Sequence, residues 1–241
     1  MEIENEIVEY VKKEPTVIGA LIFGSYARNP EGKHNDIDVL VATNANWKKR
    51  ESITIQELHV EVFYNNINEI KKELNHPFEL DRNSWFEYTK ILFDTNNKIQ
   101  ELINYAQNTT KQKLANFNKN WWQYKIGDTL QDLQNETNPN QKAFLSQCLF
   151  RDIITTFFLS KHTLPPKDNY CIKKIELIDK KFSNIANKFT QTANLDEQEQ
   201  LICKMLNYLE KDLGKPTTRL TTTKTSINIS NQSKPPKMRF K

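Results

Sequence analysis

The spacing of apolar residues changes along the chain and divides it into a strand-rich part and a helix-rich part. After a stretch with helical spacing at 2–13, the apolar and alternating segments 17–23, 36–42, 55–64 and 86–94 predict four strands. From about Lys98 the apolar residues follow the helical period, which predicts helices at 98–107, 110–134, 140–162, 171–188 and 195–212. The order of these elements favours an α+β fold in which a sheet-containing domain precedes an α-helical domain.

A third part of the chain carries no such pattern. We therefore expect a sheet domain at 1–97, a helical domain at 98–213 and a disordered tail at 214–241, which is rich in Thr, Ser, Lys and Pro. The tail holds seven of the 34 basic residues and no acid, so 27 basic residues face 30 acidic ones in the rest of the chain. A slightly acidic body disfavours a nucleic acid as the partner.

The cysteines and the N-terminal segment indicate where such a protein works. Cys148, Cys171 and Cys203 are odd in number and lack the spacing of a metal site, so a reducing compartment is expected. The acidic N-terminal segment MEIENEIVEY lacks the apolar region of a secretory signal, and no apolar run reaches the ~18 residues of a membrane span. These features predict a cytoplasmic protein without a membrane partner.

The segment LIFGSYARNPEGKHNDIDVLV at 21–41 holds the residue types of a phosphate and metal site. Gly24 follows an apolar strand and allows a sharp turn close to a ligand. Ser25 offers a hydroxyl and is expected to cap the helix that follows, whose free N–H groups attract anions. We therefore expect the outer phosphates of a triphosphate to bind at this turn.

Two carboxylates open the next strand. Asp36 and Asp38 share one face of that strand because side chains alternate, and they can hold Mg²⁺ against the phosphates. Glu61 points to the corresponding side of the following strand, although Glu57 has the same parity and is an alternative. Three carboxylates on neighbouring strands form the usual frame for chemistry with two metal ions. Each motif occurs by chance on its own, but their ordered combination strongly favours a functional site over solvated or capping acids.

This segment resembles the signature of the nucleotidyltransferase superfamily with the polymerase-beta-like fold, which reads G-S-x-A-R-G, a loop, and S-D-I-D-L. In this chain the two parts are Gly24-Ser25-Tyr26-Ala27-Arg28-Asn29 and Asn35-Asp36-Ile37-Asp38-Val39, with Asn29 in place of the glycine and Asn35 in place of the serine. Neither change affects a carboxylate. The resemblance implies a mixed sheet. It also implies an enzyme that transfers NMP from an NTP to a hydroxyl, and we expect AMP from ATP.

The resemblance also implies roles for individual residues. Gly24 and Ser25 hold the β- and γ-phosphates, while Asp36 and Asp38 bind two Mg²⁺ ions. Glu61 completes one metal site or acts as the general base on the acceptor hydroxyl. Arg28 either steadies the phosphates or pairs with an acid of the helix, and the sequence does not decide between the two.

The helical part is similar, more loosely, to the C-terminal half of the aminoglycoside and lincosamide nucleotidyltransferases, over FLSQCLFRDIITTFFLSKHTLPPKDNYCIKKI at 144–175. In that family this domain closes over the acceptor and often takes part in a dimer, so a small-molecule acceptor, for example an aminoglycoside-like antibiotic, and a homodimer are expected. The acidic body would suit a cationic acceptor. Asp152 contacts the acceptor or, as the bland alternative, is a salt-bridged structural acid.

Other residues of the helical part are better explained by structural roles. The aromatic residues Trp121, Trp122 and Tyr124 are more often core than ligand contacts, and the lysines Lys167, Lys173 and Lys174 fit a solvated helix face. Two other functions stay open: a protein-modifying nucleotidyltransferase, such as an antitoxin-like regulator, and an inactive nucleotide-binding module. The intact acids argue against the second alternative.

Overall fold

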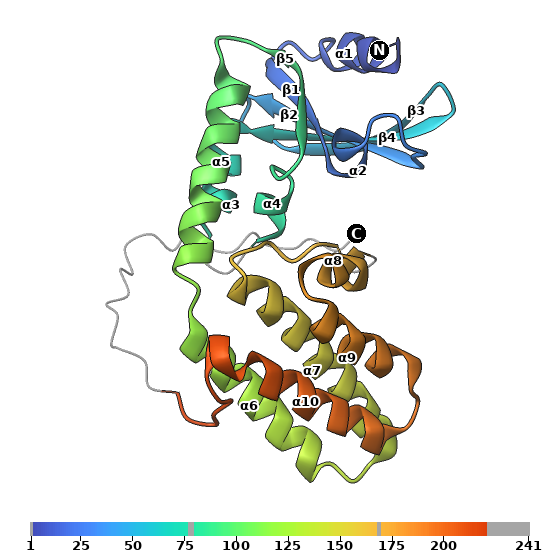
Figure 1. Cartoon of the computed structure of the whole chain (residues 1–241). Helices are drawn as coiled ribbons and strands as arrows, with labels where there is room; N and C mark the ends of the chain where they lie inside the picture. Colours follow the sequence, from blue (N-terminus) through green and yellow to red (C-terminus); the bar gives the residue numbers. More distant parts are fainter. Residues whose placement is uncertain (1, 77–79, 168–169, 221–241) are drawn as a thin grey trace, which may run out of the picture.

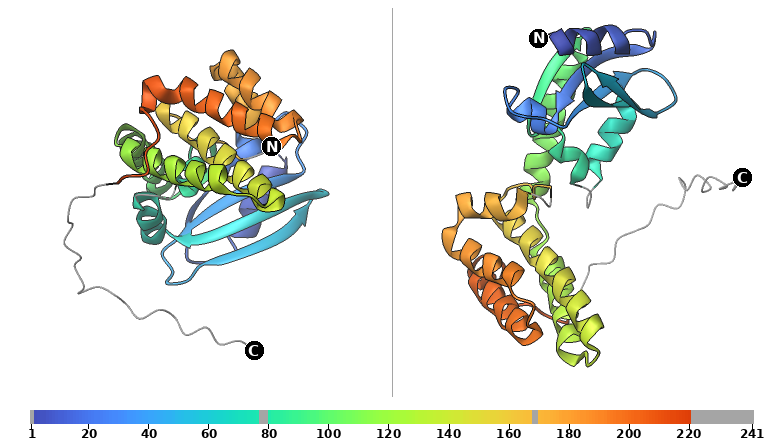
Figure 2. Two further views of the ribbon diagram at one scale, coloured as in Figure 1. Left: turned by 90° about the horizontal axis from the view of Figure 1, so that it is seen from below. Right: turned by 90° about the vertical axis from the view of Figure 1, so that its right-hand side faces the viewer.

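The computed structural model describes residues 2–76, 80–167 and 170–220 and confirms the expected α+β fold. Figure 1 shows a sheet with its helices at one end of the molecule and a group of helices at the other end. The long helix α5, Lys98–Ala115, leads from the first half to the second, and the right-hand view of Figure 2 shows the same division. Among the described residues, no helix has the length and apolar character that a membrane crossing requires.

The sheet has five strands in the order β3-β4-β2-β1-β5. The strands are β1 (Val17–Phe23), β2 (Asp36–Thr43), β3 (Lys49–Ile55), β4 (Leu58–Asn66) and β5 (Thr89–Asp94). The central pair β2 and β4 is parallel, whereas the pairs β1–β2, β1–β5 and β3–β4 are antiparallel, so the sheet is mixed. The parallel central pair matters for the site because it brings equivalent ends of two strands side by side.

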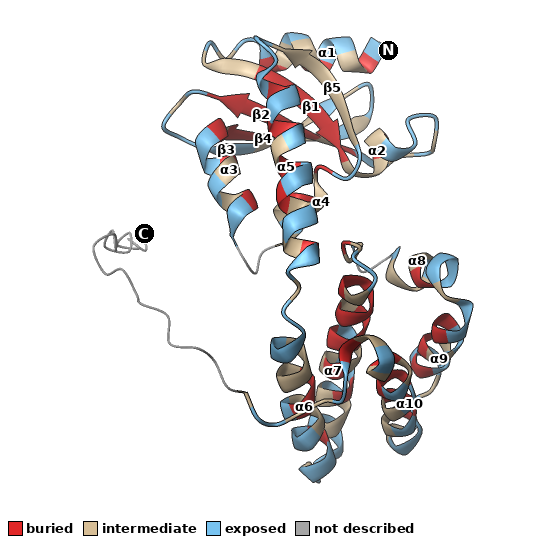
Figure 3. Cartoon of the chain, turned by 60° about the vertical axis from the view of Figure 1, so that its left-hand side comes forward, coloured by how far each residue is buried: buried red, intermediate tan, exposed pale blue. Residues whose placement is uncertain are grey.

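Helices cover both faces of this sheet. On one face, α1 (Glu2–Val11) buries Ile3, Ile7 and Val11 against strand residues that include Ile37 and Val39. On the other face lie α3 (Ile67–Asn75), α4 (Asp81–Ser84) and α5, which form a core with Leu21 and Leu40. The central strands β1, β2 and β4 hold the buried residues of the sheet (Figure 3), whereas β3 and β5 at its edges are only partly buried or exposed. The short helix α2 (Gly24–Arg28) follows β1 at the edge of the layers.

The second half consists of α6 (Lys119–Asn135), α7 (Pro139–Ser160), α8 (Cys171–Ile178), α9 (Lys180–Gln191) and α10 (Leu195–Leu213). Its core includes Phe157 and Phe182, whose rings are stacked with centroids 4.4 Å apart. Helix starts are fixed by side chains that accept backbone N–H bonds, namely those of Asn118, Asn138, Asp179 and Asn194. None of the three cysteines forms a disulfide bond.

Some element boundaries differ from the sequence prediction. The break expected at 108–109 is absent, and α5 continues to Ala115. Thr109 and Thr110 lie within this helix, and their hydroxyls donate to carbonyls one turn earlier. The predicted strand 55–64 is interrupted by a two-residue turn at Gln56 and Glu57, both with positive φ, which joins β4 to the unpredicted strand β3. The predicted helix 171–188 divides at Asp179, which caps α9. Helices α3 and α4 were not predicted.

The packing of α5 bears on where the two domains meet. Ile99, Leu102 and Ala106 of α5 belong to the core of the sheet, whereas the core of the helical half begins at Ile126. We therefore propose a boundary at 116–118, between α5 and α6, instead of the expected position at 97–98. Of the tail, residues 221–241 lie outside the described residues. Residues 214–220 run along α6, where the Thr217 N–H donates to the Gln123 carbonyl at 3.1 Å.

Candidate active site

Gly24 places the turn after β1 directly beside a carboxylate. Phe23, the last residue of β1, lies opposite Asp38 of β2. Gly24 has φ +77°, and a Cβ at this position would lie 3.1 Å from Asp38 Oδ2. A side chain here would therefore be strained by the backbone and crowded by the carboxylate. Both constraints require glycine, and they keep the space beside Asp38 open for a ligand.

Ser25 lies within the first turn of α2. The N-cap of α2 is Phe23, which makes no side-chain cap bond, so the prediction that Ser25 caps this helix was wrong. The N-cap lies two residues earlier than the sequence indicated because Gly24 already belongs to the helix. Ser25 nevertheless follows Gly24 immediately at the turn that faces Asp38.

The three predicted carboxylates lie on one face of two neighbouring strands. In the parallel pair β2–β4, Asp36 is in register with His59, and Asp38 is in register with Glu61. Asp36 is exposed, whereas the side chains of Asp38 and Glu61 are 12% and 25% exposed. Ile37, between the two aspartates, is fully buried on the opposite face. The alternative acid Glu57 lies in the β3–β4 turn, so the sheet brings Glu61 and not Glu57 beside Asp38.

Cations stand near two of these carboxylates. Arg50 of β3 donates from Nη2 to Glu61 Oε2 at 2.7 Å, and its guanidinium lies 4.8 Å from the centroid of the Phe63 ring. Lys167, between α7 and α8, places Nζ 4.0 Å from Asp38 Oδ2. The cluster of acids is therefore partly neutralised by one residue from the sheet and one from the helical half.

The surroundings of Asp38 disfavour the charged form of its carboxyl. Burial raises the pKa of its carboxyl, and the neighbouring charges of Asp36 and Glu61 add to this effect, while Lys167 and Arg50 oppose it. A buried acid beside two other acids gains more from a cation than an isolated surface acid does. The arrangement thus favours a positively charged ligand at Asp38.

These residues fit magnesium in their chemistry. Carboxylate oxygens are the ligands that Mg²⁺ prefers, and Gly24 leaves room beside Asp38. Within the described ranges, no group of three or more His, Cys, Asp or Glu side chains is already gathered as a metal cage. Glu61 is paired with Arg50 through Oε2, so a metal held by all three acids has to meet its other oxygen or displace Arg50.

Residues of the helical half also contact α2 and the segment before β5 in the sheet half. The Arg28 guanidinium lies 4.7 Å from the ring centroid of Tyr170 and 5.7 Å from that of Tyr88. Lys174 of α8 pairs with Glu87 at 3.0 Å. The interpretation of the lysines as a solvated helix face fits Lys173, which is exposed, but it missed the contacts of Lys167 and Lys174. No local pattern signals these contacts because the partners are far apart in the sequence.

Asp152 lies away from these contacts. Its Oδ1 accepts from Lys125 Nζ of α6 at 2.7 Å, and the residue is 8% exposed. This ion pair joins α6 to α7 within the helical half, as expected for a salt-bridged structural acid. Trp122 packs against Leu114, Leu159 and Leu164, whereas Trp121 is partly exposed beside Tyr124.

Comparison with known proteins agrees with this geometry. Residues 5–121 match the family model described as "Polymerase beta, Nucleotidyltransferase". The crystal structure of a nucleotidyltransferase-like protein from Exiguobacterium sibiricum is similar in fold, with a TM-score of 0.53, 12% sequence identity, and coverage of 88% of this chain and 76% of that chain. At this identity the likeness shows the fold alone, and no curated protein matches the sequence. The signature turn, the paired acids and the family match together support the nucleotidyltransferase superfamily for residues 5–121 of this chain.

Proposed function

We propose that the protein is a magnesium-dependent enzyme that transfers NMP from an NTP, first of all AMP from ATP, to a hydroxyl of a small molecule. The observation that carries this proposal is the position of Gly24 against Asp38, with Glu61 directly opposite Asp38 on the parallel strand. A turn without a side chain next to paired acids provides space for phosphate and ligands for a cation. The family match supplies the reaction class.

Each residue of the turn and the strands has a proposed role. Gly24 and Ser25 hold the β- and γ-phosphates at the start of α2, and Arg28, four residues after Gly24, steadies them. Asp36 and Asp38 are the ligands for two Mg²⁺ ions, which when bound supply the positive charge that offsets the triphosphate. Arg28 already lies against two tyrosine rings, so its contribution to phosphate binding depends on leaving them.

Glu61 is proposed either to complete a metal site or to take the proton of the acceptor hydroxyl. Its Oε2 already accepts a hydrogen bond from Arg50 Nη2. Arg50 has to release this oxygen before Oε2 can take part in either role. The freed guanidinium would lie next to the triphosphate site and would offset its negative charge.

A test of this function uses α-³²P-labelled nucleoside triphosphates, Mg²⁺ and pooled hydroxyl compounds, aminoglycosides among them. We expect label on a small molecule together with pyrophosphate release, and neither product with the Asp36→Asn or Asp38→Asn variant. Label on a protein would favour the protein-modifying alternative. Bound triphosphate without turnover in every pool would indicate an inactive binding module and would contradict the proposal.

Two further expectations from the sequence stay predictions. A homodimer is to be tested by light scattering during size-exclusion chromatography. The cytoplasmic location, expected from the three cysteines, is to be tested by fractionation of cells that express the protein.

A further inference from the structure

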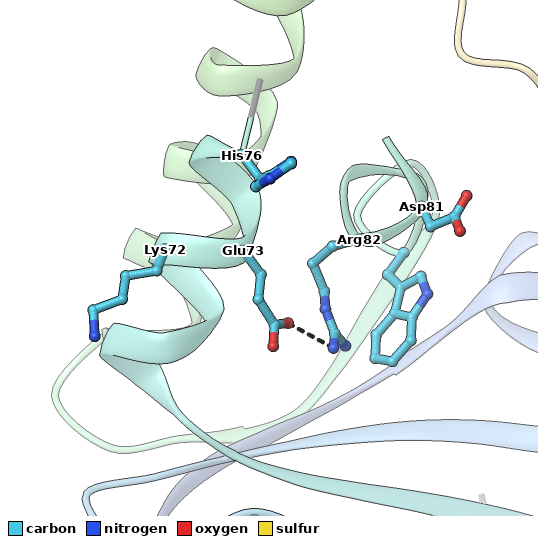
Figure 4. Close-up of a pocket in the computed structure, with 6 residues that line it drawn as sticks. Lys72, Glu73, His76, Asp81 and Arg82 are labelled. Atoms are coloured by element: carbon cyan, nitrogen blue, oxygen red, sulfur yellow. Dashed lines mark ion pairs between the residues drawn. The ribbon is translucent and has the colours of Figure 1, made fainter. Parts of the chain in front are cut away.

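A hollow lies between α3 and α4. It encloses about 480 Å³ and is lined by Lys72, Glu73, His76, Asp81, Arg82 and Trp85 (Figure 4). This volume lies within the range of roughly 300–1,000 Å³ that is typical of small-molecule sites. We call this hollow the α3–α4 cavity.

The α3–α4 cavity borders the face of the sheet that carries the carboxylates. Trp85, which lines it, stacks on Phe23 with ring centroids 4.3 Å apart and contacts Phe63 at 4.9 Å. Phe23 directly precedes Gly24, and Phe63 lies two residues after Glu61 in β4. The contacts of Trp85 with these two rings therefore connect the cavity to the strands that carry the carboxylates.

The polar centre of the cavity is the ion pair of Arg82 with Glu73. Arg82 Nη2 lies 2.6 Å from Glu73 Oε2, and the guanidinium lies 3.7 Å from the centroid of the Trp85 ring. Figure 4 shows the two charged ends pointing toward one another across the space between the helices. The Arg82 side chain is 19% exposed, and the stacked ring holds it in place.

This ion pair leaves hydrogen-bonding capacity unused. Within the described part of the chain, Arg82 Nη1 is buried and has no hydrogen-bond partner. Glu73 Oε2 meets Arg82 Nη2 in the ion pair, and a carboxylate oxygen can accept a second hydrogen bond. An unsatisfied buried donor or acceptor costs about 1–3 kcal/mol, and more when the group is charged. A ligand that accepts from Arg82 would satisfy Nη1, and a hydroxyl of the same ligand could donate to Glu73.

The other charges of the cavity do not compete for this position. In Figure 4, the Lys72 side chain extends along the outer side of α3, and the Asp81 carboxylate is turned away from the ion pair. Lys72 is paired with Glu69 of the same helix. Of the arginine and the lysine that line the cavity, Arg82 is thus the one directed toward a ligand. The Glu73 carboxylate beside it can accept a hydrogen bond from a hydroxyl group.

We propose that the α3–α4 cavity binds the acceptor substrate, and that this acceptor is a hydroxylated compound with a carboxylate or phosphate group. The anionic oxygen accepts from Arg82 Nη1, a hydroxyl donates to Glu73 Oε2, and a second hydroxyl extends past Trp85 toward Asp38 and Glu61. The inference rests on the proposed function and narrows its substrate class. It departs from the cationic acceptor that the acidic body would suit.

The test is a titration of the ¹⁵N-labelled full chain with glycerol 3-phosphate, glycerate and glycerol, followed by NMR at the indole N–H of Trp85. The chain has four tryptophans, so this signal is assigned through the Trp85→Phe variant. We expect saturable shifts with the two anionic probes and none with glycerol at the same concentration. Arg82→Gln should weaken the binding of both anions at least tenfold, whereas the matched variant Lys72→Gln should change it less than twofold.

Arg82→Gln leaves Glu73 without its cation, so it is accompanied by the double variant Glu73→Gln/Arg82→Gln, and the fold of each is checked by circular dichroism. Absence of saturable shifts, or equal anion binding in the folded double variant, would overturn the cavity proposal. In Asp38→Asn we expect the shifts to persist while transfer is lost. Persistent shifts in a wild-type protein without transferase activity would contradict the proposed function and leave the cavity as a binding site.

Discussion

Asp38 and Glu61 lie directly opposite each other on the parallel strands β2 and β4, with both side chains on the same face of the sheet. Because the two strands are parallel and in register, this pairing is set by backbone hydrogen bonds and not by a flexible loop. Glu57, which has the same parity in the sequence, lies in the turn before β4 and is exposed. The structure therefore separates two acids that the sequence pattern treats alike.

This separation predicts different effects for two matched substitutions. Glu61→Gln should lower kcat for nucleotide transfer by about 10²-fold or more, because it removes a metal ligand or a general base. Glu57→Gln should leave kcat within twofold of the wild type. Equal rates for the two variants in steady-state assays would remove Glu61 from the catalytic group.

Asp38 is expected to reduce the stability of the free protein. Its pKa is raised in the folded chain, chiefly by burial, so the ionised form is less favourable in the fold than in the unfolded chain. The cost is fully present above the raised folded pKa and disappears as pH falls below the unfolded pKa of about 4. Asp38→Asn should therefore raise Tm at pH 7, by about 2–4 °C for each kcal/mol in a chain of this size, and the gain should shrink toward pH 4.

Thermal unfolding at both pH values tests this expectation, with Asp36→Asn as the control at an exposed position. Asp36→Asn should change Tm little at either pH. A fall in Tm at pH 7 on Asp38→Asn would show that the contact with Lys167 outweighs the burial of the carboxylate.

The ion pair of Asp152 with Lys125 predicts a structural effect. Asp152→Asn removes the charge that Lys125 meets between α6 and α7, and should lower the free energy of unfolding by about 1–2 kcal/mol. The acceptor KM and the triphosphate affinity should stay unchanged in the folded variant. A rise in acceptor KM without a loss of stability would instead support the acceptor role proposed from the sequence.

The effect of Gly127→Ala on stability should depend on whether the C-terminal tail is present. A Cβ at Gly127 would lie 2.4 Å from the backbone oxygen of Thr217, so Gly127→Ala should displace residues 215–220 and destabilise the full chain. In a chain that ends at Lys215 this contact is absent, and the same substitution should stabilise α6 by about 0.5–1 kcal/mol through helix propensity. Urea unfolding of the four proteins measures both effects. Stabilisation in both backgrounds would show that the tail does not dock on α6.

Part of this architecture follows from the sequence because it is set by local periodicity. The apolar run of β1 and the alternation along β2 predict the strands, and the period of two places Asp36 and Asp38 on one face without any tertiary information. The motif predicts a glycine near the carboxylates. That Gly24 lies directly beside Asp38 could be seen only from the register of β1 and β2 in the structure.

Other features depend on partners that are distant in the sequence. The polar alternation of β3, KRESITI, is a weak strand signal that becomes a strand by pairing with β4. Lys167 meets Asp38 only because the helical half folds toward the sheet, and the unused capacity of Arg82 arises from its burial between α3, α4 and Trp85. Such contacts have no local signal, which is why the lysine was interpreted as solvated and the cavity was not predicted.

The most direct test of the central claim measures the binding of a non-hydrolysable ATP analogue by calorimetry, with and without Mg²⁺, in the wild type and in Asp38→Asn. This measurement does not depend on knowing the acceptor. We predict that Mg²⁺ tightens binding to the wild type at least tenfold and that this gain is lost in the folded variant, because Asp38 faces both the turn at Gly24 and Glu61. Equal binding with and without Mg²⁺, or an undiminished gain in Asp38→Asn, would contradict the assignment of these carboxylates as the metal-binding centre.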